Sequence, residues 1–97
     1  MKPVVFLPQA EQEMLEAAKY YESQAGGIGA NYLSEIERAI AAIAESPEIW
    51  PTIEGKLRRC LVRRFPFGIL YCIDPNKIVV VAVAHLRRKP GYWRERV

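Results

Sequence analysis

Apolar residues recur at helical spacing along two stretches in the first half of the chain. One stretch starts near Gln9 and carries on one face Ala10, Met14, Ala17, Ala18 and Tyr21; the other carries Ile28, Tyr32, Leu33, Ile36, Ile40 and Ile43. The Ala25-Gly26-Gly27 segment separates them, because glycine accepts the positive φ of a helix end. Ser46-Pro47 ends the second, since proline disfavours the α conformation in the residue before it. The pattern predicts a helical hairpin whose apolar stripes must be covered.

Four other segments have the composition of strands. Pro3–Leu7 precedes the first helix, and Leu57–Arg64, Phe67–Ile73 and Ile78–His85 follow the second, each rich in β-branched or aromatic residues. Residues 78–84 are apolar on both faces, which predicts a central strand covered on both sides in the working assembly. The order β-α-α-β-β-β predicts an α+β fold with an N-terminal strand, an αα-hairpin and a three-stranded antiparallel sheet. We expect residues 1–97 to form one domain, with residues 86–97 as a basic and aromatic C-terminal segment.

Composition excludes several classes of protein. The longest apolar run, Ile78 to Ala84, is far shorter than the roughly 20 residues that a membrane helix needs. The start of the chain lacks the features of a signal peptide, so we expect a cytoplasmic location and no membrane partner. With two cysteines and one histidine, the chain has no zinc-ligand cluster, and it has no glycine-rich phosphate loop. We therefore expect no metal and no cofactor.

Charge is divided unevenly between the two halves. Residues 1–50 hold three basic and eight acidic residues, a net charge of −5, whereas residues 51–97 hold eleven basic and three acidic residues, a net charge of +8. This asymmetry indicates a basic surface that meets an anionic partner, either nucleic acid or an acidic protein segment. Five of these basic residues lie in the last twelve positions, 86–97, where they are interleaved with Tyr92 and Trp93. That C-terminal segment is either mobile or anchored through its two aromatic side chains.

Several segments together carry a family resemblance. They are Glu16-Ala17-Ala18-Lys19-Tyr20-Tyr21-Glu22, Pro47-Glu48-Ile49-Trp50-Pro51, Arg63-Arg64-Phe65-Pro66-Phe67-Gly68-Ile69-Leu70-Tyr71 and the closing run from His85 to Arg96. In this order and at this length the sequence resembles the RelE/ParE superfamily of type II toxin–antitoxin toxins. The apolar bend Phe65-Pro66-Phe67-Gly68 resembles the ParE-like members more closely than the RelE nucleases.

The resemblance implies a toxin that a separate antitoxin neutralises. The antitoxin is expected to be acidic and partly disordered, to form a hetero-oligomer with this chain, and to carry the complex to operator DNA. ParE-like members inhibit DNA gyrase without known nuclease chemistry, and plasmid stabilisation is a role typical of such modules. RelE-like members cleave messenger RNA on the ribosome.

The residues leave both activities open. A metal-independent nuclease would draw its cations and acid–base groups from Arg59, Arg63, His85, Arg87, Arg88 and Tyr92, because RNA cleavage needs a base, an acid and charge stabilisation. RelE-type nucleases have an arginine where this chain has Gly68, which favours gyrase inhibition and a protein that is not an enzyme. A third hypothesis is that the protein is a non-toxic nucleic-acid-binding module.

Contacts with the antitoxin or the target are expected at the basic and aromatic residues of the second half. These residues are Arg58, Arg59, Arg63, Arg64, Arg87, Arg88, Tyr92, Trp93 and Arg94. The alternative for the arginines is pairing with glutamates of the helices, which contributes only about 0–1 kcal/mol for each exposed pair.

Overall fold

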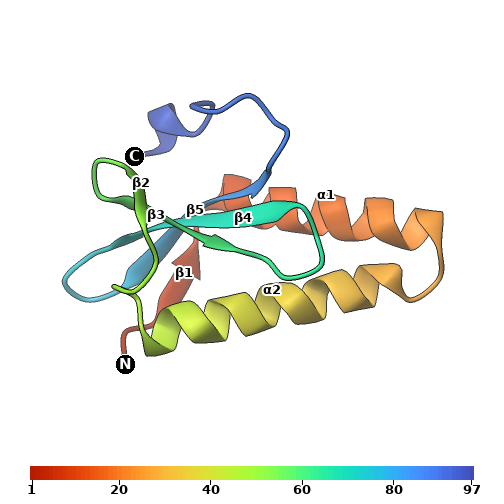
Figure 1. Ribbon diagram of the computed structural model, residues 1–97, viewed down its shortest axis with the longest axis horizontal. Helices are drawn as coiled ribbons and strands as arrows, with labels where there is room; N and C mark the ends of the chain where they lie inside the picture. The colour runs from red at the N-terminus through yellow and green to blue at the C-terminus, as the bar shows by residue number, and fades with distance from the viewer.

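Two antiparallel helices lie on one face of a five-stranded sheet, and the C-terminal segment lies on the other (Figure 1). The computed structural model describes all 97 residues. In chain order the elements are β1 (Val4–Phe6), α1 (Pro8–Gln24), α2 (Ile28–Glu45), β2 (Thr52–Glu54), β3 (Leu57–Leu61), β4 (Phe67–Ile73), β5 (Ile78–His85) and a 3-10 turn, η1 (Arg94–Arg96).

The sheet has the strand order β1-β5-β4-β3-β2. β1 pairs in parallel with the first half of β5, and the other neighbours are antiparallel. The α+β class, the helical hairpin and the order of the predicted elements are confirmed. The predicted count of strands is wrong by one, because β2 was not expected. All three residues of β2 are exposed, so this edge strand carries no alternation of buried and exposed positions that could reveal it.

Two of the predicted strands are longer than the observed ones. The first was expected to span Pro3–Leu7, whereas β1 covers only Val4–Phe6. The strand expected to reach Arg64 ends at Leu61, because the chain turns there: Arg64 has a φ of 70°, in the left-handed region, and the Phe67 N–H donates to the Phe65 carbonyl.

β5 lies inside the sheet and both of its faces are buried, as its apolar sequence predicts. Ile78, Val80 and Val83 belong to the core shared with the helices. Val81 and Ala84 belong to a smaller core on the opposite face, which includes Trp93 and is packed by Tyr92. β5 is therefore covered on both sides, as expected, and the cover on the second face is the chain's own C-terminal segment.

A β-bulge interrupts β5 at Val81. Leu70 pairs with Ala82 and Tyr71 pairs with Val80, which leaves Val81 without an opposite residue on β4. The bulge lets two consecutive side chains, Val81 and Ala82, both join the core beneath the C-terminal segment. It also falls where β1 ends, because the last bond from that side runs from the Leu7 N–H to the Val80 carbonyl. Beyond Val80 the edge of β5 faces no strand.

The two helices approach closely at their connection. A Cβ on Gly29 would lie 2.7 Å from the Ala18 carbonyl oxygen, so only glycine fits there. The Glu22 carboxylate accepts the N–H groups of Gly27 and Gly29, which are unpaired donors at the start of α2. Neither helix has the length and apolarity needed to cross a bilayer.

The two cysteines are free thiols in different parts of the sheet. Cys60 is opposite Ile69 and Cys72 is opposite Val79. The register of the sheet therefore does not place the two cysteines opposite each other. Burial raises the pKa of the Cys60 thiol to about 11, so this side chain behaves as a core residue.

Candidate functional site

The last residue of β5, His85, holds the centre of the candidate site. Its ring packs edge-on against Phe67, with 5.1 Å between the ring centroids. Its Nδ1 atom accepts the backbone N–H of Arg87 at 3.1 Å. Since Nδ1 is an acceptor, the neutral ring carries its proton on Nε2, which leaves that nitrogen for an external group.

A cavity of about 190 Å³ brings four of the predicted site residues together. Arg59 from β3, His85 from β5 and Arg88 from the C-terminal segment all line it, and the buried Trp93 forms part of its wall. Two of these side chains are cationic, so the cavity suits a small anion or an acidic side chain.

Gly68 explains how Arg59 reaches this cavity. A Cβ at position 68 would lie 3.0 Å from Cδ and 3.1 Å from Cγ of Arg59. The stem of Arg59 therefore lies across β4 in the space that a side chain at 68 would fill. Gly68 was predicted to mark the loss of a cation. In the fold, the neighbouring strand β3 places the Arg59 side chain, a cation, beside Gly68.

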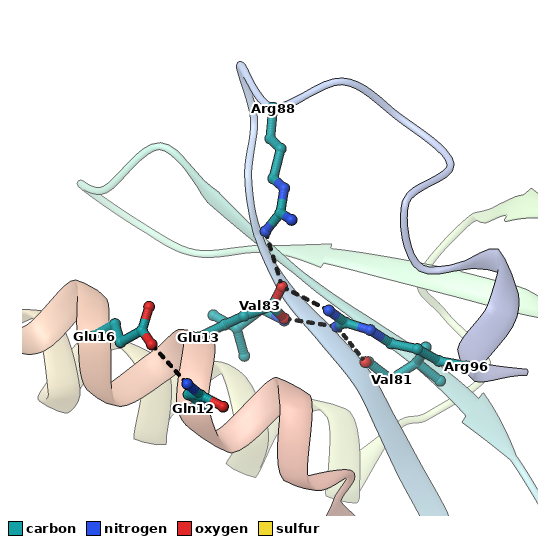
Figure 2. A network of polar contacts seen from close by, with 7 residues as sticks. All are labelled: Gln12, Glu13, Glu16, Val81, Val83, Arg88 and Arg96. Carbon is teal, nitrogen blue, oxygen red and sulfur yellow. Dashed lines mark hydrogen bonds and ion pairs between the residues drawn. The ribbon is translucent and has the colours of Figure 1, made fainter.

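Glu13 of α1 organises the other side of the site (Figure 2). Its carboxylate accepts hydrogen bonds from Arg96 at 2.9 and 3.2 Å and from Arg88 at 3.2 Å. It also accepts the backbone N–H of Val83 at 3.1 Å, while Arg96 donates to the Val81 carbonyl at 3.1 Å. The side chains of Glu13 and Arg96 thus form hydrogen bonds with the backbone of β5 beyond Val80, where β1 no longer pairs with it.

Tyr92 lies among these charged groups. The Arg88 guanidinium stacks 3.5 Å from the centroid of its ring, and that of Arg96 lies 5.1 Å away. Burial, followed by the negative charge of Glu13, raises the pKa of the Tyr92 hydroxyl to about 12. The hydroxyl is therefore neutral at physiological pH and is poorly suited to act as a base.

The C-terminal segment is anchored, so the first alternative, a mobile tail, is excluded. Trp93 is 7% exposed in the core below the sheet. Arg94 donates to both oxygens of Glu54 on β2, with a shortest distance of 2.7 Å, and these hydrogen bonds lower the pKa of that carboxyl. Arg94 is thus paired within the chain.

The structure separates the remaining predicted residues from the cavity of His85. Arg58 binds the carbonyls of Glu48 and Trp50 at 2.9 and 2.6 Å, which fastens the loop after α2. Arg63 lines a different cavity, between α2 and β3, and Arg64 lies in the turn before β4. Arg59, Arg63, Arg64 and Arg87 are exposed, and their guanidinium groups make no hydrogen bond or ion pair within the chain.

A second cavity, of about 300 Å³, shares His85 and Arg88 with the first. Its other walls come mainly from α1, including the carboxylates of Glu13 and Glu16 and the rings of Tyr20 and Tyr21. His85 therefore lies between a cation-lined cavity and one with acidic and aromatic walls. Nowhere in the chain do three or more His, Cys, Asp or Glu side chains gather as metal ligands would.

Sequence reasoning missed Glu13. An acidic residue near the start of a helix is usually accounted for by the helix dipole, which favours negative charge there. A different signal was present: Glu13 is three residues after Ala10 and four before Ala17, so it lies on the apolar stripe of the helix. A carboxylate on a buried face needs partners, and here they come from the end of the chain.

Comparisons with known proteins agree with this geometry. Residues 4–90 match the model of the ParE toxin family, described as the toxin of the type II toxin–antitoxin system parDE. A solved structure titled "Chromosomal ParDE TA system from P. aeruginosa" superposes with a TM-score of 0.68 at 12% identity, covering 90% of this chain and 98% of that one. No curated protein matches the sequence significantly. Because the family model spans nearly the whole chain, the protein belongs to the ParE toxin family and is a toxin component of a type II toxin–antitoxin system.

Proposed function

We propose that this toxin inhibits DNA gyrase and that a cognate antitoxin neutralises it in a hetero-oligomeric complex. Membership of the ParE family supports the toxin role. The choice of gyrase as the target rests on the ion pairs that the C-terminal arginines form within the chain. Arg88 and Arg96 are both bound to Glu13, and Arg94 is bound to Glu54.

That internal pairing is the observation that carries the proposal. RNA cleavage needs cations free to stabilise a charged phosphorane and a base near neutral pKa. Here the cations at the end of the chain neutralise carboxylates, and the Tyr92 hydroxyl is buried with its pKa raised to about 12. These residues hold the fold, so toxicity through contact with a protein target is favoured over catalysis.

Messenger RNA cleavage on the ribosome is the second candidate. The cavity lined by Arg59, His85 and Arg88 favours it, because that cavity offers a cation from β3 and an imidazole with a free Nε2. A reaction there would use His85 as the acid–base group and Arg59 as the phosphate contact. It would not depend on Tyr92 ionising.

The two candidates separate in one set of assays with purified toxin. Gyrase inhibition predicts loss of supercoiling of relaxed plasmid in the presence of gyrase and ATP, with messenger RNA on programmed ribosomes left intact. His85→Ala should then keep most of the inhibition. Ribosome-dependent cleavage that His85→Ala abolishes would instead replace gyrase with RNA as the target. Normal growth of cells that express the toxin alone would refute both activities.

The antitoxin contact is expected at the exposed, unpaired cations. We propose that Arg59, Arg63, Arg64 and Arg87 meet acidic side chains of the antitoxin, because none of their guanidinium groups has a partner within the chain. Charge pairing of this kind speeds association and is screened by salt. Co-expression with the adjacent small reading frame should give a complex on size exclusion. The double charge reversal Arg63→Glu/Arg64→Glu should weaken it, and Lys77→Glu, at the β4–β5 turn, serves as the control.

A further inference from the structure

Two residues that line one small cavity between α2 and β3 each carry a buried polar atom without a partner. Glu35 of α2 is 5% exposed, and its Oε1 atom accepts no hydrogen bond. The indole N–H of Trp50, in the loop after α2, donates to no acceptor. Both residues line a cavity of about 110 Å³ on the side of the sheet away from Trp93. Native proteins pair nearly all buried polar atoms, so an unsatisfied acceptor and an unsatisfied donor on residues that line one cavity point to a missing partner.

The charges around the cavity restrict what can enter. An anion would be repelled by the Glu35 carboxylate. A cation would meet Arg38, whose guanidinium lies 3.6 Å from Glu35 Oε2, and Arg63, which also lines the cavity. A neutral group that both donates and accepts avoids both penalties. It can donate to Glu35 and accept from Trp50.

We propose that this cavity binds a primary carboxamide, as carried by the side chain of Asn or Gln in a partner chain. A carboxamide has two N–H donors and a carbonyl acceptor held in one plane. The volume equals that of about three to four waters at roughly 30 Å³ each, which a small amide group can fill. Ala39, Ala42 and Cys60 supply apolar wall around the polar pair.

The edge of β3 makes the cavity accessible to an extended chain. β2 pairs with β3 as far as Arg58, and the Arg59 N–H donates to the Pro51 carbonyl. Leu61, the last residue of β3, has no strand on that side, is exposed, and lines the cavity. A partner segment lying along this edge can place one side chain into the cavity. This site is separate from the cavity of His85 and does not depend on whether the target is gyrase or the ribosome.

Titration with acetamide tests the carboxamide chemistry. The indole N–H signal of Trp50 in a nitrogen–proton correlation spectrum should shift and saturate at millimolar acetamide. The signal of Trp93 is the internal control, since its N–H is also buried and unpartnered but lies on the opposite face of the sheet. Acetate and guanidinium should give no saturable shift. The proposal would be overturned by equal shifts at both tryptophans or by tighter binding of either ion. It would also be overturned if the Trp50 N–H contacted only a bound water and did not respond to acetamide.

Variants tie the response to the two polar atoms. Glu35→Leu should abolish the saturable shift. Glu37→Leu, an exposed change two residues further along α2, should leave the shift unchanged. If Glu35→Leu does not fold, Trp50→Phe removes the donor instead, and binding is read from the backbone amides of Ala39 and Ala42. Unchanged acetamide affinity in Trp50→Phe would refute the site.

A capped amino acid separates a partner side chain from a free amide. N-acetyl-glutamine methylamide should bind at least as tightly as acetamide, because its backbone can pair with the free edge at Leu61. N-acetyl-glutamate methylamide, with the same shape and a negative charge, should not bind. Binding of acetamide without binding of the capped glutamine would overturn the assignment to a partner chain.

Discussion

Glu13 and Arg96 join two parts of the chain that are 83 positions apart. The guanidinium of Arg96 donates to both oxygens of the Glu13 carboxylate, and both side chains are largely buried, at 15% and 14% exposed. Each also pairs one backbone group of β5: Glu13 takes the Val83 N–H and Arg96 the Val81 carbonyl. The ion pair therefore closes the open half of a strand edge and fixes the C-terminal segment to α1.

Glu13→Ala should destabilise the protein by about 3 kcal/mol, because removing one partner leaves a buried guanidinium without its counter-charge. The Val83 N–H loses its acceptor at the same time. This is a large part of the roughly 5–15 kcal/mol by which a domain is stable. Urea unfolding followed by circular dichroism measures the change.

A double-mutant cycle with Arg96→Met isolates the pair. The coupling free energy between positions 13 and 96 is expected to be about 1–3 kcal/mol, as for residues in direct contact within one network. Glu16→Ala, an exposed change one turn along α1, serves as the control with little effect. Additive losses from the two single variants would mean that the pair contributes nothing of its own.

Trp93→Ala should cost about 3–5 kcal/mol, the range for truncating a large buried aromatic side chain. Trp93 covers Leu57, Leu70 and Val81 on the face of the sheet opposite the helices. Its loss exposes an apolar sheet face, so increased binding of a hydrophobic dye and self-association should accompany the lower stability. Tyr20→Ala, at a position that is 60% exposed, provides the comparison. A wild-type melting temperature for Trp93→Ala would show that the segment is dispensable.

The pH dependence of stability should show the burial of Tyr92. Its pKa is raised from 10.0 to about 12 in the folded protein, so above pH 10 the unfolded chain loses a proton that the folded chain keeps. The contribution of Tyr92 is fully present below pH 10 and is lost as the pH rises toward 12. Burial also raises the pKa of Tyr71 to about 12, and Tyr71 lowers stability over the same pH range whether or not Tyr92 is present.

Comparison with Tyr92→Phe isolates this group. The free energy of unfolding of the variant should fall less steeply between pH 10 and pH 12 than that of the wild type. Absorbance titration of the phenolates supplies an independent reading. Parallel stability profiles in the two proteins would contradict the assigned shift.

Gly68→Ala tests the path of Arg59. The added Cβ would lie within about 3 Å of the Arg59 stem, which is flexible and can move aside. We expect stability to change by less than about 1 kcal/mol while the Arg59 guanidinium leaves the cavity of His85. Binding of the antitoxin or the target should then weaken about as much as in Arg59→Ala. Gly26→Ala, at an exposed position with open space around it, is the matched control.

Local patterns were enough to predict most of the fold. The 3.6-residue spacing from Ala10 to Ile43 defined both helices, and the apolar run of residues 78–84 identified the strand buried on both faces. β2 could not be predicted, because its three exposed residues gain their conformation only from pairing with β3. The bulge at Val81 was equally invisible, since it is a mismatch between two strands.

The sequence by itself determined the elements, the charge asymmetry and the family resemblance, because these depend on neighbours along the chain. Tertiary structure alone decided which arginines are free. Arg88, Arg94 and Arg96 look equivalent to Arg59, Arg63 and Arg87 in the sequence, yet the first three are bound to glutamates that folding brings from α1 and β2. The reason is physical: a carboxylate on a buried helix face must find its counter-charge in space, and the chain supplies it from the opposite end.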